Sequence, residues 1–383
     1  MVNAMHLAAL VQILLAATAN PAPAVTRIPR SASPAGAADY VCLEPLSPRV
    51  VLAYWLGVDR RCNLTAIASA KGLVLIDTEM SPRIMAPIQQ RLEQHFGRND
   101  WTCVINTHAH DNHAGGNSLF PAAALIGHEN LAADMQWLIR RQTEPDWKAR
   151  ELDAMATTIR NFRALLPRYA GRRTDTRRIL GEITFWELHA QDLQEGYPIV
   201  PPATTFADRR TIDLGDLTVE LTFFGRGHST SDTLVYIPQE KLLVSGAIAY
   251  QRAQLPEIGE QTDLTDIQRF LTILDSLLAP ETKIDRVIPS HSPPLRKADL
   301  KPVRDYYQKM LVGMRQARRD NLTLDQTMER LSVRNSFPNF RDPPPGHWAH
   351  GMQQRNIRNL WRILSGDPDP APPMPASTHN HHP

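Results

Sequence analysis

The stretch WTCVINTHAHDNHAGG, residues 101–116, joins a short apolar run to a loop with three histidines within six positions. The run WTCVIN is typical of a buried strand, and the loop begins where this predicted strand ends. Alternate residues of an extended segment share one side, so His108 and His110 can hold one ion together. Gly115 and Gly116 allow the chain to turn sharply below such an ion. The stretch therefore predicts a metal site at the end of a strand.

Two more histidines follow later predicted strands. His228 follows the strand that ends at Phe224, in GRGHS, and His291 follows the strand-like run VIPS. Because strand ends at one edge of an α/β sheet converge, histidines from distant segments can meet there. Imidazole nitrogens favour zinc, and three of them with one water form an open catalytic site. A lone histidine after a strand is usually structural, but five in this arrangement favour a metal centre.

The remaining pattern predicts an α/β fold with appendages. Strand and helix patterns alternate from residue 50 to residue 141, strand patterns resume at residue 204, and this order predicts an α/β sandwich. Residues 143–200 interrupt the pattern as an insertion. We favour a solvated helical excursion there, and the alternative is a lid whose Arg172 and Arg173 meet an anionic substrate. Residues 298–366 are predicted to be a helical extension that serves packing or homodimer contacts.

On these motifs the chain resembles the metallo-β-lactamase fold superfamily over about residues 45–297. The motifs, in chain order, are LIDTE, THAHDNHAGG, GRGHSTSD, LLVSGA and IPSHS. The resemblance implies an αββα four-layer sandwich with one or two metal ions at the sheet edge. It also implies a zinc hydrolase, since members act mostly on lactams, thioesters, lactones, or sulfate and phosphate esters.

The resemblance assigns one zinc to three histidines and a second zinc to two others. The first set is His108, His110 and His228, and the second set is His113 and His291. Two positions depart from the family pattern. Asn112 stands where an aspartate usually binds the second metal, and Ala247 stands where a second carboxylate often lies. We therefore expect one firmly bound zinc ion and a weak or absent second one.

One zinc ion is enough for hydrolysis. Three imidazoles and zinc lower the pKa of a bound water to about 7, and the metal-bound hydroxide can attack a carbonyl or ester-type bond. Asn112 can hold this water by a hydrogen bond, and Asp111 is a base only if the loop rearranges. Asp77 either fixes a loop or a ligand imidazole, or is only a turn residue at a strand end. Asp232 is interpreted as structural, shaping the turn after His228.

Three functions remain open. The leading one is an exported zinc hydrolase with a small-molecule substrate. The second is a catalytically weak or inactive family member that binds a metabolite or a partner, and the third is a metal-dependent oxidoreductase. The net charge of 42 − 40 = +2 gives no strong field toward nucleic acid or an anionic membrane, so neither partner is expected.

The two ends of the chain differ from its middle. The apolar run LAALVQILLAA near the N-terminus is too short to span a bilayer, which takes about 20 residues, and fits a signal peptide. We predict a signal peptide over 1–24, a linker over 25–44 and a disordered Pro-rich tail over 367–383. The protein is then periplasmic or secreted, and Cys42 and Cys62 could pair in that compartment.

Overall fold

The computed structural model describes residues 34–57, 62–250, 254–341, 343 and 349–366. The predicted signal peptide and Pro-rich tail lie outside the described residues. The chain forms two compact units. The first runs to Phe206 and includes Leu214–Asp216, and the second comprises Ala207–Asp213 and the chain from Leu217 onward.

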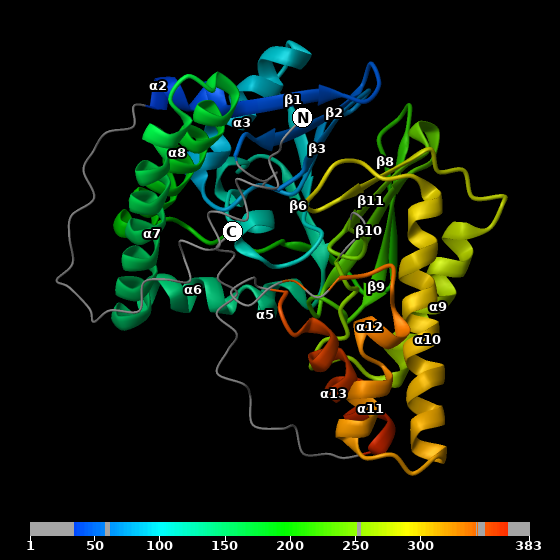
Figure 1. Cartoon of the computed structure of the whole chain (residues 1–383). Coiled ribbons are helices and arrows are strands. Elements are labelled where there is room, and N and C mark those ends of the chain that lie inside the picture. Colours follow the sequence, from blue (N-terminus) through cyan, green and yellow to red (C-terminus); the bar gives the residue numbers. More distant parts are fainter. Residues whose placement is uncertain (1–33, 58–61, 251–253, 342, 344–348, 367–383) are drawn as a thin grey trace. The chain divides into compact units, whose positions relative to one another are not determined.

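The first unit is built on a mixed sheet of seven strands that neighbour one another in chain order (Figure 1). The strands are β1 (Val41–Pro45), β2 (Val50–Trp55), β3 (Leu64–Ser69), β4 (Gly72–Ile76), β5 (Trp101–Ile105), β6 (Ala124–His128) and β7 (Thr204–Phe206). Strands β1 to β4 pair antiparallel, and β4 to β7 pair parallel. Because β4 and β5 run in the same direction, the loops that follow them begin at the same edge of this sheet.

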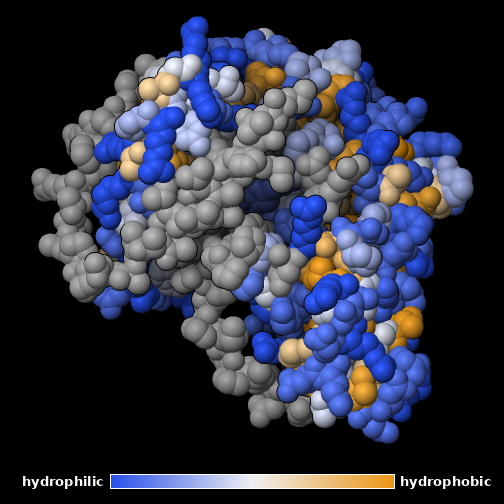
Figure 2. All heavy atoms as spheres, viewed as in Figure 1, coloured by the Kyte–Doolittle hydropathy of each residue, from blue (hydrophilic) through white to orange (hydrophobic). Residues whose placement is uncertain are grey.

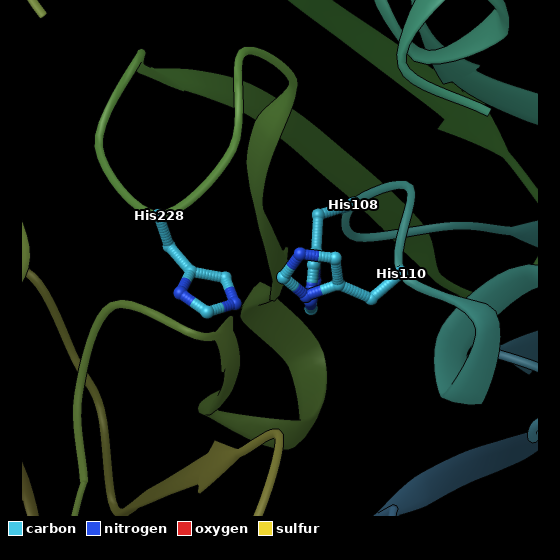
Figure 3. Close-up of side chains that lie close together, drawn as sticks. All are labelled: His108, His110 and His228. Atoms are coloured by element: carbon cyan, nitrogen blue, oxygen red, sulfur yellow. The ribbon is translucent and has the colours of Figure 1, made fainter. Parts of the chain in front are cut away.

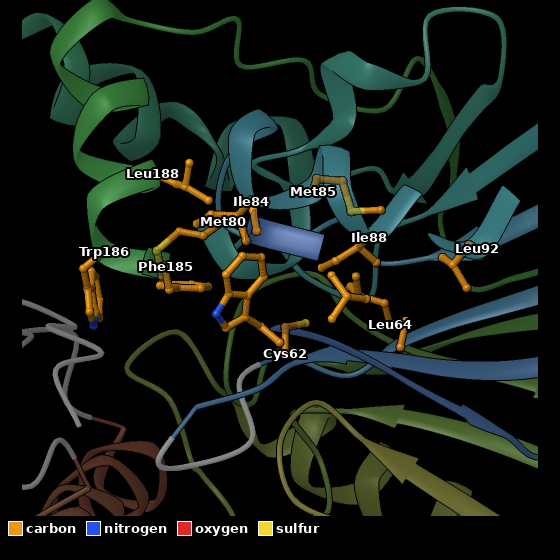
Figure 4. Close-up of a cluster of buried hydrophobic side chains, with 14 of the residues drawn as sticks. Cys62, Leu64, Met80, Ile84, Met85, Ile88, Leu92, Phe185, Trp186 and Leu188 are labelled. Carbon is orange, nitrogen blue, oxygen red and sulfur yellow. The ribbon is translucent and has the colours of Figure 1, made fainter. Parts of the chain in front are cut away.

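Helices cover this sheet and build its core. They are α2 (Pro34–Ala37), α3 (Pro82–Phe96), α4 (Asp111–Ala114), α5 (Leu131–Asp134), α6 (Gln136–Thr143), α7 (Pro145–Leu165) and α8 (Arg173–Glu195). Helix α3 begins at Pro82, and Gly97 follows its end in the left-handed conformation. Its residues Ile84, Ile88 and Leu92 repeat every four positions and point into the apolar core, which Figure 4 shows.

Two predicted segments of this unit have a definite structure. The insertion expected at 143–200 holds α7 and α8, which pack against each other. The linker expected at 25–44 is wrong at its C-terminal end, because β1 begins at Val41 and pairs with β2. Strand β1 is a short edge strand with only Val41 fully buried, so it lacks the clear alternation that identifies a strand in a sequence.

The second unit is built on a mixed sheet of five strands in the order β12-β11-β10-β9-β8. The strands are β8 (Arg209–Asp213), β9 (Thr218–Gly225), β10 (Asp232–Ile237), β11 (Leu242–Gly246) and β12 (Arg286–Pro289). Its helices are α9 (Leu264–Leu278), α10 (Leu300–Arg319), α11 (Leu324–Arg330), α12 (Val333–Ser336) and α13 (Met352–Ser365). A capping box formed by Thr323 and Gln326 starts α11.

Helices α9, α10 and α13 share one apolar core with this sheet. Phe224 of β9 stacks on Phe270 of α9, with ring centroids 4.6 Å apart, and Tyr307 of α10 lies beside Phe270 at 4.9 Å. The two mixed sheets, their flanking helices and the C-terminal helices confirm the predicted α/β fold class.

The face of the described chain that Figure 2 shows exposes mainly polar groups. Figure 2 shows mainly hydrophilic side chains over the C-terminal helices, with hydrophobic ones among them. No helix within the described ranges combines the length and the apolar character that a membrane crossing requires.

Candidate metal centre

The histidine loop follows β5 and leads into the short helix α4. His110 is the residue before α4 and has an extended backbone, with φ −70° and ψ 151°. The rings of His108 and His110 lie edge to face with centroids 4.8 Å apart, and Figure 3 shows both side chains on this loop. The predicted pair of neighbouring imidazoles is therefore present in the first unit.

Asp77 fixes this loop from the end of β4. Its carboxylate accepts hydrogen bonds from the backbone N–H and the hydroxyl of Thr107, both at 2.8 Å. The Thr107 Oγ1 atom lies 3.0 Å from His108 Nδ1. When the proton is on Nδ1, His108 donates to Thr107 and presents Nε2 as its metal-binding nitrogen. The structure thus favours the interpretation of Asp77 as a residue that orients a loop and a ligand imidazole.

His113, the predicted ligand of the second metal, lies in a buried polar cluster of the same unit. Its Nδ1 is 2.8 Å from Asp77 Oδ2 and 3.3 Å from Cys62 Sγ, and its Nε2 is 3.1 Å from Asn112 Nδ2. Ligand atoms of Cys62, Asp77 and His113 all lie within 4.8 Å of one another, so these three side chains are a candidate metal-binding group. Both ring nitrogens of His113 therefore already face groups of the chain.

The cysteines do not form the disulfide that the sequence allowed. Cys42 and Cys62 are both free thiols, and Cys62 is buried. Burial raises the pKa of the Cys62 thiol well above its ordinary value, and the negative charge of Glu79 raises it further. Cys62 is therefore a neutral thiol beside the His113 ring.

The two glycines after the histidine loop form the expected turn and have a second purpose. Gly115 and Gly116 have ordinary φ values of −67° and −89°. A Cβ on Gly115 would lie 2.0 Å from the Met80 carbonyl oxygen, and one on Gly116 would lie 2.1 Å from that of Thr78. Both glycines lie in a turn, as expected, and they also allow two backbone segments to pack in direct contact.

Asp111 is held by an ion pair with the helix that precedes the predicted insertion. Its carboxylate pairs with Arg141 of α6 and accepts the N–H of Asn112 at 2.8 Å. Arg141 also pairs with Glu151 of α7 at 2.7 Å. Although burial opposes its charge, these carboxylates raise the pKa of Arg141 above its ordinary value. The arrangement favours Asp111 as an anchor of the loop over its role as a base. Arg141 had no sequence signal, because it occurs in an ordinary amphipathic helix.

His228 lies in the second unit, on the loop that follows β9. Its Nδ1 is 2.8 Å from Glu257 Oε2, and its backbone N–H donates to Asp232 Oδ2 at 2.7 Å. Although burial opposes protonation, the hydrogen bond and charge of Glu257 raise the pKa of His228 above its ordinary value. Metal-binding histidines commonly donate their second ring nitrogen to a carboxylate in this way. Glu257 lies in a segment without a recognisable motif, so the sequence did not identify it.

Asp232 shapes the loop that carries His228. It accepts hydrogen bonds from the N–H of Ser229 at 3.0 Å and from its hydroxyl at 2.6 Å, in addition to the N–H of His228. Burial raises its pKa to about 6. These contacts agree with the structural role predicted for this residue.

The remaining predicted positions also lie in the second unit. His291 is on the loop after β12, and its ring is parallel to that of Tyr250 with centroids 6.5 Å apart. Ala247 directly follows β11 and is buried. Ala247 therefore places no carboxylate at the end of β11.

An α/β fold that presents histidines at strand ends is typical of metal-dependent hydrolases. The chain belongs to the metallo-beta-lactamase superfamily, because the model of that family matches residues 57–291.

Individual relatives are distant. The chain is 28% identical over 98 residues to a metallo-beta-lactamase type 2 from Bacteroides fragilis, and this match spans 26% of the chain and 38% of the relative. The structure is similar to that of the stereoselective inverting sec-alkylsulfatase Pisa1 from Pseudomonas sp., with a TM-score of 0.57 and 17% identity. That match covers 87% of this chain and 52% of the sulfatase. A metallo-beta-lactamase from Pontibacter korlensis matches with a TM-score of 0.46 and 16% identity, over 70% of this chain and 99% of that one.

Proposed function

We propose that the protein is a zinc-dependent hydrolase that cleaves a carbonyl or ester-type bond, such as a lactam, lactone or thioester. The observation that carries the proposal is the neighbouring pair His108 and His110, held on a loop that Asp77 and Thr107 fix. This arrangement occurs in a chain that belongs to a superfamily of metal-dependent hydrolases.

The proposed first zinc site combines three histidines. They are His108, His110 and His228, which Figure 3 labels. Because Nδ1 of His228 faces Glu257, we propose that its Nε2 is the nitrogen that binds the metal. Zinc, when bound by three imidazoles, lowers the pKa of its water to about 7 and polarises the oxygen of the bond under attack.

The second zinc position is expected to bind weakly. Its proposed ligands are His113 and His291, and the usual carboxylates are replaced by Asn112 and Ala247. An amide oxygen is neutral and is a weaker donor to zinc than a carboxylate. Nδ1 of His113 faces Asp77, and its Nε2 lies 3.1 Å from the Asn112 amide nitrogen, which is not a carboxylate that could share a metal. We therefore propose one firmly bound zinc ion per chain.

The chain's own groups have distinct tasks in this proposal. Asn112 holds the attacking water by a hydrogen bond, and the Asp77–Thr107 pair keeps His108 oriented. Asp111 stays bound to Arg141 and keeps the loop in place. No further base is required, because the water is already ionised near neutral pH.

The substrate is proposed only as a chemical class. The relatives named above act on β-lactams and on alkyl sulfates by their printed names, and this chain spans well under half of the lactamase that it matches. A small-molecule lactam, lactone, thioester or sulfate ester is the class to test. We further propose that the protein is exported, with residues 1–24 as its signal peptide.

Zinc content and turnover test this function on the purified full chain. We expect about one zinc per chain after dialysis, because three histidines supply all the protein ligands of one open catalytic zinc site. The variant Asn112→Asp should retain more zinc, and Asn99→Asp, which adds the same charge at an exposed position, should not. Two tightly bound zinc ions in the natural protein would contradict our account of Asn112.

Turnover separates hydrolysis from the second candidate function, a family member that only binds its ligand. The absence of a carboxylate at position 112 favours this second candidate. A panel of chromogenic lactam, lactone, thioester and sulfate ester substrates should include at least one that zinc-loaded protein cleaves. No turnover by either the natural protein or Asn112→Asp would favour binding over hydrolysis.

A further inference from the structure

The segment Pro256–Glu260 lies against the loop that carries His228. A Cβ on Gly259 would lie 2.4 Å from the Gly227 carbonyl oxygen, so the two backbones are in direct contact. The hydroxyl of Thr262 also donates to the Arg226 carbonyl oxygen. The position of this segment therefore determines where the backbone next to His228 can lie.

Glu257 is the residue of this segment that reaches the His228 ring. Its Oε2 is 2.8 Å from His228 Nδ1, and the two side chains are 17% and 5% exposed. A carboxylate at this position selects the tautomer with the proton on Nδ1, and it makes Nε2 a stronger donor to a metal. It also prevents the ring from rotating away from its binding orientation.

The C-terminal helices hold the backbone on both sides of Glu257. From α10, the hydroxyl of Tyr307 donates to the Glu257 carbonyl oxygen at 3.1 Å. From α13, Asn356 accepts the N–H of Ile258 at 2.9 Å and donates to the Pro256 carbonyl oxygen at 2.7 Å. Asn359 donates to the Ile258 carbonyl oxygen at 2.7 Å. Side chains of two helices thus bond to three consecutive residues.

Apolar packing fixes the same segment. Leu255 and Ile258 are 2% and 1% exposed, and both belong to the core that includes Tyr306, Tyr307 and Ile357. The hydroxyl of Tyr306 accepts a hydrogen bond from Asn356 at 2.6 Å. This network is buried, so each bond in it is costly to break.

We propose that Glu257 is a positioning residue for the metal ligand His228, and that α10 and α13 set its place by holding the backbone of Pro256–Glu260. The C-terminal helical extension is then part of the metal centre, although it supplies no ligand. This inference rests on the proposed function, because it requires His228 to bind the metal.

Variants of Glu257 test the first step by zinc affinity, measured on the full chain by competition with a chromogenic chelator. Glu257→Gln keeps the acceptor oxygen but loses the charge, and Glu257→Ala loses both. We expect about 10–100-fold weaker zinc binding, the range found when a carboxylate partner of a metal-binding histidine is removed. The zinc-free Glu257→Gln protein should unfold at nearly the same temperature as the zinc-free natural protein. If the role of Glu257 were purely structural, lost zinc affinity would be accompanied by a lower unfolding temperature. Glu260→Gln, an exposed residue of the same segment, is the matched control.

A tyrosine pair tests the second step. Tyr307→Phe removes the hydrogen bond to the Glu257 carbonyl oxygen and leaves the ring in the core, so zinc affinity should fall several-fold. Tyr236→Phe removes a comparable bond, from its hydroxyl to the Lys283 carbonyl oxygen at 2.7 Å, and should leave zinc affinity unchanged. Natural zinc affinity in Tyr307→Phe would overturn the role of α10.

His228→Ala separates failure of this inference from failure of the proposed function. If His228→Ala weakens zinc binding while both Glu257 variants bind as the natural protein does, His228 is a ligand and the positioning role of Glu257 is wrong. If His228→Ala leaves zinc binding unchanged, the proposed ligand set itself is wrong. If all three weaken binding, adding Glu257→Gln to His228→Ala should cause little further loss, because Glu257 acts through His228.

Discussion

At the scale of single residues, Asp77 has more contacts with the histidine loop than its place at a strand end suggests. It is 1% exposed, accepts two hydrogen bonds from Thr107 and lies against the His113 ring. Its φ of 66° lies in the left-handed region, which asparagine and aspartate tolerate better than other residues. A substitution that keeps the shape and removes the charge therefore isolates its electrostatic contribution.

We expect Asp77→Asn to lower the free energy of unfolding by about 1–3 kcal/mol, because it leaves a buried donor without its acceptor. Zinc affinity should fall as well, since His108 loses part of its orientation. Urea unfolding measures the first effect and chelator competition the second. The control is Asp153→Asn, an exposed position on α7. An Asp77→Asn protein as stable as that control would show that Asp77 is only a turn residue.

The neighbouring histidines of the loop after β5 could be predicted from the sequence, and the residues that contact this loop could not. His108 and His110 lie two positions apart at the end of a strand, so local spacing alone predicts that they share one side. Glu257 is 29 positions from His228, and Arg141 is 30 positions from Asp111. Such pairs form only through the tertiary fold, and a single sequence carries no local pattern for them.

At the scale of elements, Arg141 of α6 links the histidine loop to α7 through two ion pairs. Arg141 is paired with Asp111 and Glu151, and their side chains are between 4% and 11% exposed. Removing the cation leaves two buried carboxylates without compensation, which typically costs 3–5 kcal/mol. We expect urea unfolding to show a strongly lowered free energy of unfolding for Arg141→Gln. The control Arg140→Gln, at an exposed neighbouring position, should have nearly the free energy of unfolding of the natural protein.

A second change tests the cause of that loss. Adding Asp111→Asn to Arg141→Gln removes one of the two uncompensated charges, so part of the stability should return. If the two residues act independently, Asp111→Asn should lower the free energy of unfolding by the same amount in the Arg141→Gln protein as in the natural protein. That result would contradict the proposed cause.

Helix α9 is not among the predicted elements, although its start has a capping box. Asp263 accepts the N–H of Asp266, whose side chain in turn accepts the N–H of Asp263. Burial opposes the charge of Asp263, but the bond from Asp266 and the nearby Arg226 hold its pKa below the ordinary value. A carboxylate with a lowered pKa in the folded state stabilises the protein above its unfolded pKa, about 3.9, and this contribution disappears as the pH falls through the folded value.

We therefore expect Asp263→Ala to lose about 1 kcal/mol of stability at neutral pH, the usual cost of removing an N-cap. The difference from the natural protein should begin to shrink when urea unfolding is repeated below about pH 4, where the unfolded chain binds the proton. It should be smallest below the lowered folded-state pKa, where the aspartate is protonated in both states. The exposed Glu281→Ala serves as the control for a lost surface charge. A difference that stays constant with pH would show that the cap acts without its charge.

At the scale of the whole molecule, repetitive patterns were the predictable part of the fold. Helix α3 and strand β6 both lie within residues 50–141, where alternating strand and helix patterns were predicted. Edge strand β1 was missed because only part of it is buried. The role of the C-terminal helices was also not predictable, since an amphipathic pattern shows that a helix has a buried face and does not show what that face covers.

The structure answers this last question within the second unit and leads to a test on truncated chains. Val303, Met310 and Ile357 of the C-terminal helices are at most 5% exposed and share a core with α9. Each fully buried side chain of this size contributes about 1.5–3 kcal/mol, so a few of them equal the net stability of a typical domain, about 5–15 kcal/mol.

A chain that ends at Arg296 should therefore lose cooperative unfolding and bind zinc weakly, because Phe270 and its neighbours become exposed and the Glu257 segment loses its support. A chain that ends at Gly366 is the control, since it retains α13 and removes only the predicted Pro-rich tail. Calorimetry and chelator competition on both proteins give the answer. If the shorter chain unfolds cooperatively near the natural temperature, the extension is a separate domain. If the shorter chain binds zinc as tightly as the natural protein, the C-terminal helices do not contribute to zinc binding.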